Sequence, residues 1–141
     1  MIGLDTTFLV AWEMIDHADH ERCRDSLASL LDAESRFAVT AGVLAEFVHV
    51  VTDPRRFSNP LAMSVALSRV AFWGTAVEVR VLAADQRCVE CFIDWMTRRG
   101  LGRKRLLDTL LAATFHVHGI RQILSLNNSD FEVFDCFEFP L

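Results

Sequence analysis

The sequence predicts an α/β domain with three layers, α/β/α, built around a mostly parallel central sheet. Apolar stretches of strand length alternate with longer stretches of helical periodicity about four times along the chain. Near the C-terminus a helix leads directly into a buried strand, which favours parallel pairing because helical crossovers join parallel strands. The 141 residues suit one domain, residues 1–141, which can bury about two-thirds of the surface of its unfolded chain.

The first predicted strand is short and ends in an acid. Ile2–Leu4 is apolar, Asp5 follows it, and Thr6 and Thr7 can cap a brief helix that runs through Trp12. Ligands of open α/β sheets bind at the carboxyl ends of the strands, so Asp5 is a candidate functional residue. A turn or capping role for Asp5 is the alternative.

An amphipathic helix is expected over Asp16–Ala33. His17 and His20 lie three residues apart near its start and could share a metal ion. No acid stands nearby at a matching spacing, so a solvated beginning of the helix is the simpler interpretation of the two histidines.

The next strand and helix carry a candidate glutamate. Arg36–Val39 reads as a strand, Thr40 as a helix cap, and Ala41–Thr52 as a helix with a wide apolar face. Glu46 and His49 fall on the opposite, polar face. Periodicity alone therefore places Glu46 in solvent, and a functional role is compatible with that position if the polar face lines a cleft.

Two prolines interrupt the chain in Asp53–Pro60, because each disfavours helix in the residue before it. Arg55 and Arg56 within this break could contact an RNA backbone or could pair with acids. A helix is expected to restart at Leu61 and to run to Trp73.

Valines alternate with charged residues over Ala76–Leu82, which predicts a strand near a sheet edge. A helix follows over Ala84–Arg99, and four of its apolar residues are expected in the core: Val89, Phe92, Ile93 and Met96. Cys88 and Cys91 form a single CxxC pair within it. Without a second pair this spacing is a weak indication of a metal or redox site, and we expect small buried apolar side chains instead.

Residues Arg105–Phe131 carry two acids at the ends of two elements that must pack side by side. Asp108 lies in the first turn of a helix, where free backbone N–H groups favour an anion. Asn127 and Asp130 lie just past a buried strand predicted over Ile120–Leu126. Asp108 and Asp130 should therefore point towards one edge of the sheet.

The C-terminal tail contains the last predicted strand. In Val133–Phe139 apolar and polar residues alternate again, which predicts a final strand.

The net charge of −5 argues against a protein that coats nucleic acid through bulk positive potential. A basic run nevertheless precedes Asp108 and could draw phosphate towards the acids, although a solvated loop is the alternative: Arg98, Arg99, Arg103, Lys104 and Arg105.

The chain has no apolar run of the roughly 20 residues that a membrane helix requires. Met1–Trp12 has no basic region and carries Asp5, which argues against a signal peptide. We therefore expect a cytoplasmic protein that does not enter a membrane.

Four short motifs occur in an order that resembles PIN-domain nucleases, especially the toxins of the VapBC toxin–antitoxin class. Leu4–Leu9 is similar to the family's opening strand with its first acid, and Leu44–Phe47 is similar to the helix that supplies its glutamate. Asp108-Thr109 with the following Ala112-Ala113, and then Asn127–Phe131, resemble its C-terminal half. The resemblance spans nearly the whole chain.

The resemblance implies a divalent-metal-dependent endoribonuclease with a PIN-like fold. A metal-activated water would hydrolyse RNA phosphodiester bonds and leave a 5′-phosphate and a 3′-hydroxyl. An all-oxygen cluster of acids suits Mg²⁺ or Mn²⁺. The implied metal ligands are Asp5, Glu46, Asp108 and Asp130, and the residues expected to orient a carboxylate or a water are Thr6 and Asn127.

The same resemblance implies an RNA substrate, a cognate antitoxin whose C-terminal segment covers the acids, and a homodimer. Candidate RNA-binding residues are Arg55, Arg56, Arg103, Lys104 and Arg105.

Two other function classes remain open at this point. A phosphoacceptor signalling domain would need two adjacent early acids and a late lysine, whereas the only lysine is Lys104. A catalytically inactive PIN-like interaction module would share the fold, and loss of metal binding would be its mark.

Overall fold

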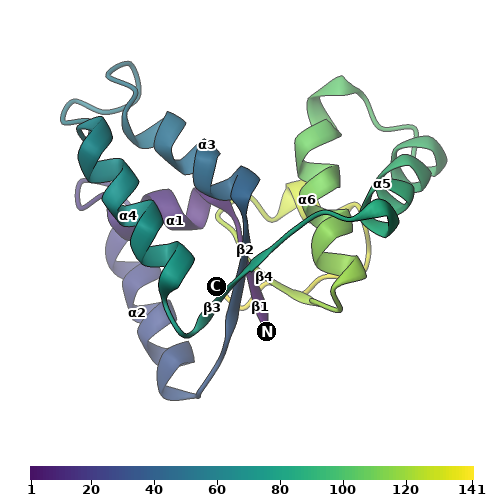
Figure 1. The fold of residues 1–141 in the computed structure, drawn as a ribbon, viewed down its shortest axis with the longest axis horizontal. Helices are drawn as coiled ribbons and strands as arrows, with labels where there is room; N and C mark the ends of the chain where they lie inside the picture. The colour runs from purple at the N-terminus through teal and green to yellow at the C-terminus, as the bar shows by residue number, and fades with distance from the viewer.

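The computed structural model describes residues 1–141, with a parallel sheet of four short strands at the centre (Figure 1). The strands are β1 (Ile2–Leu4), β2 (Phe37–Thr40), β3 (Val79–Leu82) and β4 (Gln122–Leu124). Their order is β3-β2-β1-β4 and every neighbouring pair is parallel. The predicted α/β class and the edge position of the third strand are confirmed.

Helices cover both faces of this sheet, which makes the predicted three layers (Figure 1). One face carries α1 (Thr6–Glu13), α2 (His20–Asp32), α3 (Ala41–Val51) and α4 (Met63–Thr75). The other face carries α5 (Gln86–Arg98), the short 3₁₀ helix η1 (Arg103–Arg105), α6 (Leu106–Val117) and α7 (Ser129–Glu132). None of the helices is long and apolar enough to cross a membrane.

The two faces of the strands belong to separate hydrophobic clusters. Ile2 and Leu4 of β1 pack with the α1–α4 layer, while Ala38 of β2 packs with α6 and the C-terminal tail. Gly3 faces the α6 side, where a Cβ atom would lie 2.6 Å from the Phe115 ring. The small residues of the central strands thus let α6 lie close to the sheet and bring its N-terminal turn to the carboxyl edge.

Several predicted boundaries are wrong by a few residues, and two errors are larger. The second helix begins at His20 rather than Asp16, because the Asp19 N–H is bonded to His17 Nδ1 in a turn. No strand forms over Val133–Phe139, where only an isolated bridge joins Gln122 and Glu138. Buried Phe131 and Phe134 are spaced by three residues, as a helical turn requires, and not by two.

Of the four α5 residues predicted in the core, Phe92 and Met96 are half-buried, while the prediction is wrong for Val89 and Ile93. Val89 is 40% exposed and Ile93 is 55% exposed, whereas Cys88 is fully buried. This helix lies at the outer end of the molecule and packs chiefly on α6, so only a narrow stripe of it is covered (Figure 1).

Candidate active site

Asp5 is the most buried of the four acids and lies directly after β1. Its Oδ2 atom accepts hydrogen bonds from Thr7 Oγ1 at 2.7 Å and from Ser125 Oγ at 2.9 Å. Those hydroxyls in turn accept the backbone N–H groups of Leu126 and Asn127, each at 3.0 Å. Both hydroxyl protons are therefore directed at Asp5, and Oδ1 is left without a side-chain partner.

The two threonines that the sequence suggested as helix caps have other partners. Asp5 occupies the position before α1, and Thr6 and Thr7 lie inside its first turn. The Thr6 hydroxyl donates to Glu46 Oε2 at 2.6 Å, so it orients an acid on α3. Thr6 thus contacts a carboxylate, as expected. The hydrogen bond of Thr7 to Asp5 was not expected, and the only sign of it in the sequence is the position of Thr7 two residues after Asp5.

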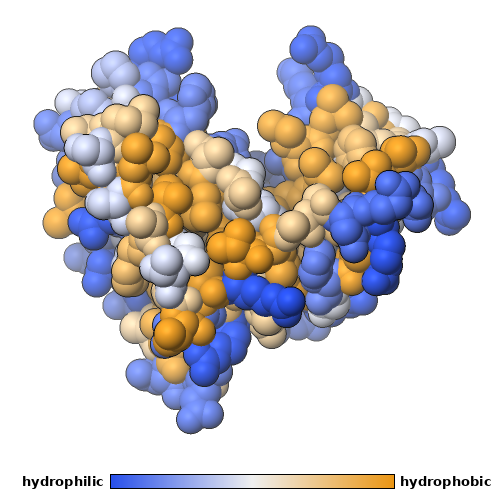
Figure 2. Space-filling model, viewed as in Figure 1, coloured by the Kyte–Doolittle hydropathy of each residue, from blue (hydrophilic) through white to orange (hydrophobic).

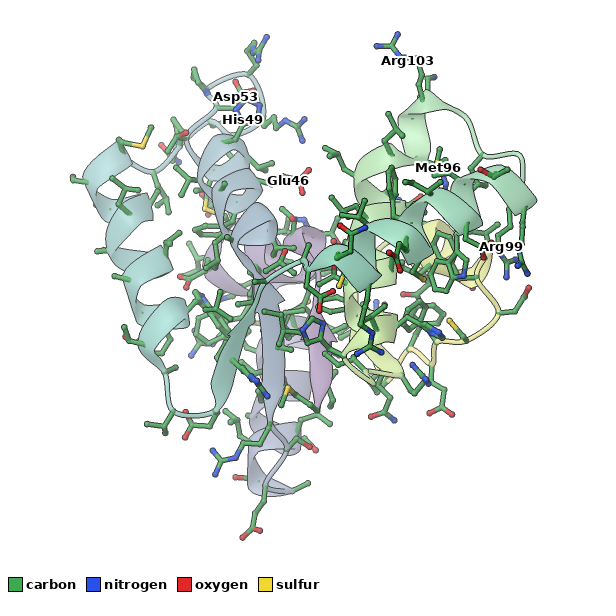
Figure 3. All side chains as sticks on the ribbon, turned by 45° about the vertical axis from the view of Figure 1, so that its right-hand side comes forward. Glu46, His49, Asp53, Met96, Arg99 and Arg103 are labelled. Carbon is green, nitrogen blue, oxygen red and sulfur yellow. The ribbon has the colours of Figure 1, made fainter.

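Glu46 is exposed on α3 and projects into the gap between the two halves of the molecule, on the same side of the helix as His49 (Figure 3). An exposed position and a functional role of Glu46 are compatible, because Glu46 and His49 line a groove; the role itself stays a prediction. Figure 2 shows this hollow from one side, between an α4-containing half and an α6-containing half.

Asp108 lies in the first turn of α6 and accepts no hydrogen bond from another side chain. Its pKa is raised from 3.8 to about 6, chiefly by burial and next by the charge of Asp130; Asp5 and Glu46 add smaller increases, and Arg105 opposes the rise. Burial likewise raises the pKa of Asp5, against its hydroxyl and backbone partners. The negative charges of Asp5 and Asp108 are therefore disfavoured in the metal-free protein.

Asp130 differs from the other acids because both of its carboxylate oxygens have partners. Arg105 Nη1 donates to Oδ1, Asn127 Nδ2 donates to Oδ2, and Arg105 Nη2 also donates to the Asp130 carbonyl oxygen at 2.8 Å. Asn127 and Asp130 thus lie together past β4, as expected. Arg105, a candidate for RNA binding, is instead engaged with Asp130.

A cavity of about 530 Å³ is lined by all four acids. Its wall also contains Thr6, Thr7, His17 and Arg56. Without a cation, no three acidic, histidine or cysteine side chains converge closely enough to hold a metal ion as they stand. An ion would have to draw them together, which the unfavourable charge of Asp5 and Asp108 would promote.

The remaining basic candidates lie on two exposed segments, and one of them reaches the cavity. Arg55 and Arg56 both pair with Asp53, at 3.0 and 3.8 Å. Only Arg56 of the two also lines the cavity of the acids. Arg103 and Lys104 are exposed on η1, at the tip of the α6 half, where Figure 3 shows Arg103 extending away from the molecule.

A second, more apolar groove of about 700 Å³ adjoins the acids between α3 and α6. Leu107, Leu110 and Leu111 of α6 line it opposite Val43 and Ala45 of α3. The helical spacing of the leucines gives α6 an apolar face, but Leu106 is 42% exposed and Leu107 is 75% exposed. Thr109, Ala112 and Phe115 form the buried face of α6 instead.

Comparisons with known proteins agree with this architecture. The chain is 40% identical over 63 residues to ribonuclease VapC7 of Mycobacterium tuberculosis, a stretch that is 45% of this chain and 43% of that relative. The chain thus covers less than half of the relative's length. Among solved structures, VapC20 of Mycobacterium tuberculosis, a toxin that cleaves the sarcin-ricin loop, superposes with a TM-score of 0.70 at 19% identity and 92% coverage of both chains.

The VapBC-1 structure from nontypeable Haemophilus influenzae superposes with a TM-score of 0.67 at 14% identity, over 99% of this chain and 96% of that one. These two structures share the fold. Residues 2–135 match the family model of the PIN domain, which includes all four acids and nearly the whole sheet and helix arrangement. The chain therefore belongs to the PIN domain family.

Proposed function

We propose that this protein is a divalent-metal-dependent endoribonuclease and the toxin of a type II toxin–antitoxin system. The observation that carries the proposal is the single cavity lined by Asp5, Glu46, Asp108 and Asp130, which come from four separate elements. The charges of Asp5 and Asp108 are unfavourable as they stand, and hydrolysis of a phosphodiester requires a way to bring another anion next to the acids.

The donor set fits a hard cation. Asp5 Oδ1 and both oxygens of Asp108 have no side-chain partner, and Glu46 has one oxygen engaged by Thr6. All the donors are carboxylate oxygens, which Mg²⁺ and Mn²⁺ prefer. When bound, such an ion supplies charge neutralisation and activates water for attack on phosphorus.

The residues around the acids have separate roles in this proposal. Thr7 and Ser125 hold the Asp5 carboxylate in one orientation, and Thr6 holds that of Glu46. Arg56 lines the cavity and would attract the phosphate backbone, and the exposed Arg103 and Lys104 on η1 would attract more distant parts of the same backbone.

The apolar groove supports an antitoxin as partner. Half-exposed leucines next to a set of catalytic acids are costly in water, and a helical or extended segment laid over them would cover the acids as well. The Haemophilus influenzae relative is a VapBC structure. We propose that a cognate antitoxin occupies this groove, and that the toxin acts on RNA in the cytoplasm.

The test is cleavage of structured RNA by the purified protein with Mg²⁺ or Mn²⁺, with EDTA as the metal-free control. A sarcin-ricin-loop hairpin and transfer RNA are the first substrates to use, because the VapC20 relative is described as cleaving that loop. Asp5→Asn and Asp108→Asn remove a charge without a change of size, and Asp25→Asn changes an exposed acid on α2 far from the cavity.

Metal-dependent cutting that both site variants lose and Asp25→Asn retains would support the nuclease. If the wild-type protein cuts no RNA, and calorimetry detects no binding of either ion, the chain is a PIN-like interaction module instead.

A further inference from the structure

The cavity of the acids contains one histidine, His17, which reaches it from the turn between α1 and α2. The turn holds this residue in place: its backbone N–H donates to the Met14 carbonyl at 2.9 Å, and its carbonyl accepts from His20 N at 3.0 Å. The side chain is 28% exposed. His17 is therefore a fixed part of the cavity wall and not a freely moving surface residue.

The hydrogen bond to the ring determines which nitrogen carries the proton. His17 Nδ1 accepts the backbone N–H of Asp19 at 3.1 Å, and an accepting nitrogen cannot also be protonated. The neutral ring thus carries its proton on Nε2. Nε2 has no hydrogen-bond partner in the protein, so it is an unused donor on a side chain that lines the cavity.

The other side chains that line the cavity indicate what the Nε2–H group could bind. Four carboxylates line it, and the hydroxyls of Thr6 and Thr7 in its wall already donate to Glu46 and Asp5. The other side chains in the wall with N–H donors are His17 and Arg56. A phosphate group that enters between the acids and this wall meets repulsion on one side and needs hydrogen-bond donors on the other. The Asp19 carboxylate lies 3.9 Å from Nδ1, the ring nitrogen that is not the free donor.

We propose that His17 binds the RNA backbone at the active site, with Nε2–H donating to a non-bridging phosphate oxygen. This inference rests on the proposed ribonuclease function and adds a substrate-binding residue to it. His20 provides a contrast three residues later, because its Nδ1 atom is 3.0 Å from the Ala11 carbonyl oxygen and its side chain does not line the cavity.

Two substitutions of His17 distinguish the role of Nδ1 from the role of Nε2. The shorter His17→Asn can still accept the Asp19 N–H through its side-chain oxygen but has no group at the Nε2 position. The longer His17→Gln can place an amide N–H near that position. A structural role through Nδ1 therefore predicts that His17→Asn is the milder change, and a substrate role through Nε2 predicts the reverse.

The experiment measures cleavage of an RNA hairpin with Mg²⁺, binding of the same fluorescein-labelled hairpin by anisotropy, Mg²⁺ affinity by calorimetry, and Tm. We expect His17→Asn to lower kcat/KM and RNA affinity by about 10- to 100-fold, as for loss of a hydrogen bond to a charged group, with Mg²⁺ affinity and Tm unchanged. His17→Gln should recover most of that loss, and His20→Gln should behave as wild type.

Wild-type RNA affinity and cleavage in His17→Asn would overturn the inference while leaving the nuclease intact. Equal losses in His17→Asn and His17→Gln, or a loss accompanied by a lower Tm, would also overturn it, since the ring would then act through the turn. If the wild-type protein does not cut RNA, the proposed function fails, and the anisotropy series still decides whether His17 contacts RNA.

Discussion

Replacing Asp108 by asparagine should stabilise the metal-free protein at neutral pH. Burial, with Asp130 as the next cause, raises the pKa of Asp108 from 3.8 to about 6. The folded protein therefore binds this proton more tightly than the unfolded chain does. The resulting contribution to stability is complete below pH 3.8 and is lost as the pH rises through about 6.

The size of the effect follows from the pKa. A rise from 3.8 to about 6 corresponds to at most ~3 kcal/mol. Asp108 is only half-buried, so solvent screening reduces this to roughly 1 kcal/mol. For a chain of this length the corresponding change in Tm is about 2–4 °C.

Thermal unfolding in EDTA at pH 7.5 and at pH 4 provides the assay. Asp108→Asn should have the higher Tm at pH 7.5, and its advantage should vanish towards pH 4, where the wild-type carboxyl is protonated. Added Mg²⁺ should raise the free energy of unfolding of the wild type by about 1.4 kcal/mol when its concentration is ten times the Kd. The variant, which has lost one ligand charge, should be stabilised less.

Asp25→Asn serves as the control, since that exposed acid on α2 has no ion-pair partner and should show none of this behaviour. A lower Tm for Asp108→Asn than for wild type in EDTA at pH 7.5 would refute the reasoning, because the ionised carboxylate would then be favourably placed.

Two further predictions concern the support of the site. Thr7→Val removes a donor to Asp5 and an acceptor at nearly constant volume, so it should cost about 1–3 kcal/mol in urea denaturation and lower Mg²⁺ affinity roughly 10- to 100-fold by calorimetry. Wild-type Mg²⁺ affinity in this variant would show that Asp5 needs no such support. Gly3→Ala should destabilise by about 1–3 kcal/mol because its Cβ would overlap the Phe115 ring, whereas Gly74→Ala in α4 has open space and should stabilise by about 0.5–1 kcal/mol. Equal denaturation midpoints for the two alanine variants would contradict this account of the packing.

The sheet could be predicted from the sequence because each strand is a short apolar stretch next to helical periodicity. Two of the acids can be located by their place in the chain, since Asp5 directly follows β1 and Asp108 lies in the first turn of α6, whereas only the family resemblance singles out Glu46. At the carboxyl edge of a parallel sheet such positions must lie near one another. For this reason the convergence of the elements could be inferred without any knowledge of side-chain contacts.

The errors arise where burial depends on distant packing. Val89 and Ile93 have helical spacing, yet α5 packs chiefly on α6, with Trp95 also stacked on Phe134 of the tail. The apolar side of α5 is therefore wider than the surface that its neighbours cover. Leu107 fits a core pattern equally well but lines the groove next to Asp108. Periodicity shows that a helix has an apolar side, and it cannot show whether that side meets the core, a groove or a partner.

In the basic segment before α6, neighbouring residues of the same charge have different surroundings, which the sequence does not reveal. Arg105 is adjacent in sequence to exposed Lys104, but its guanidinium turns inward and pairs with Asp130, while Asn127 engages the other oxygen. The positive charge of Arg105 opposes the rise in the pKa of Asp108. Of the four acids, Asp130 therefore has the least free capacity to bind a cation, and it holds a permanent positive charge inside the site. A cation in the proposed metal site would accordingly depend mainly on the other three acids.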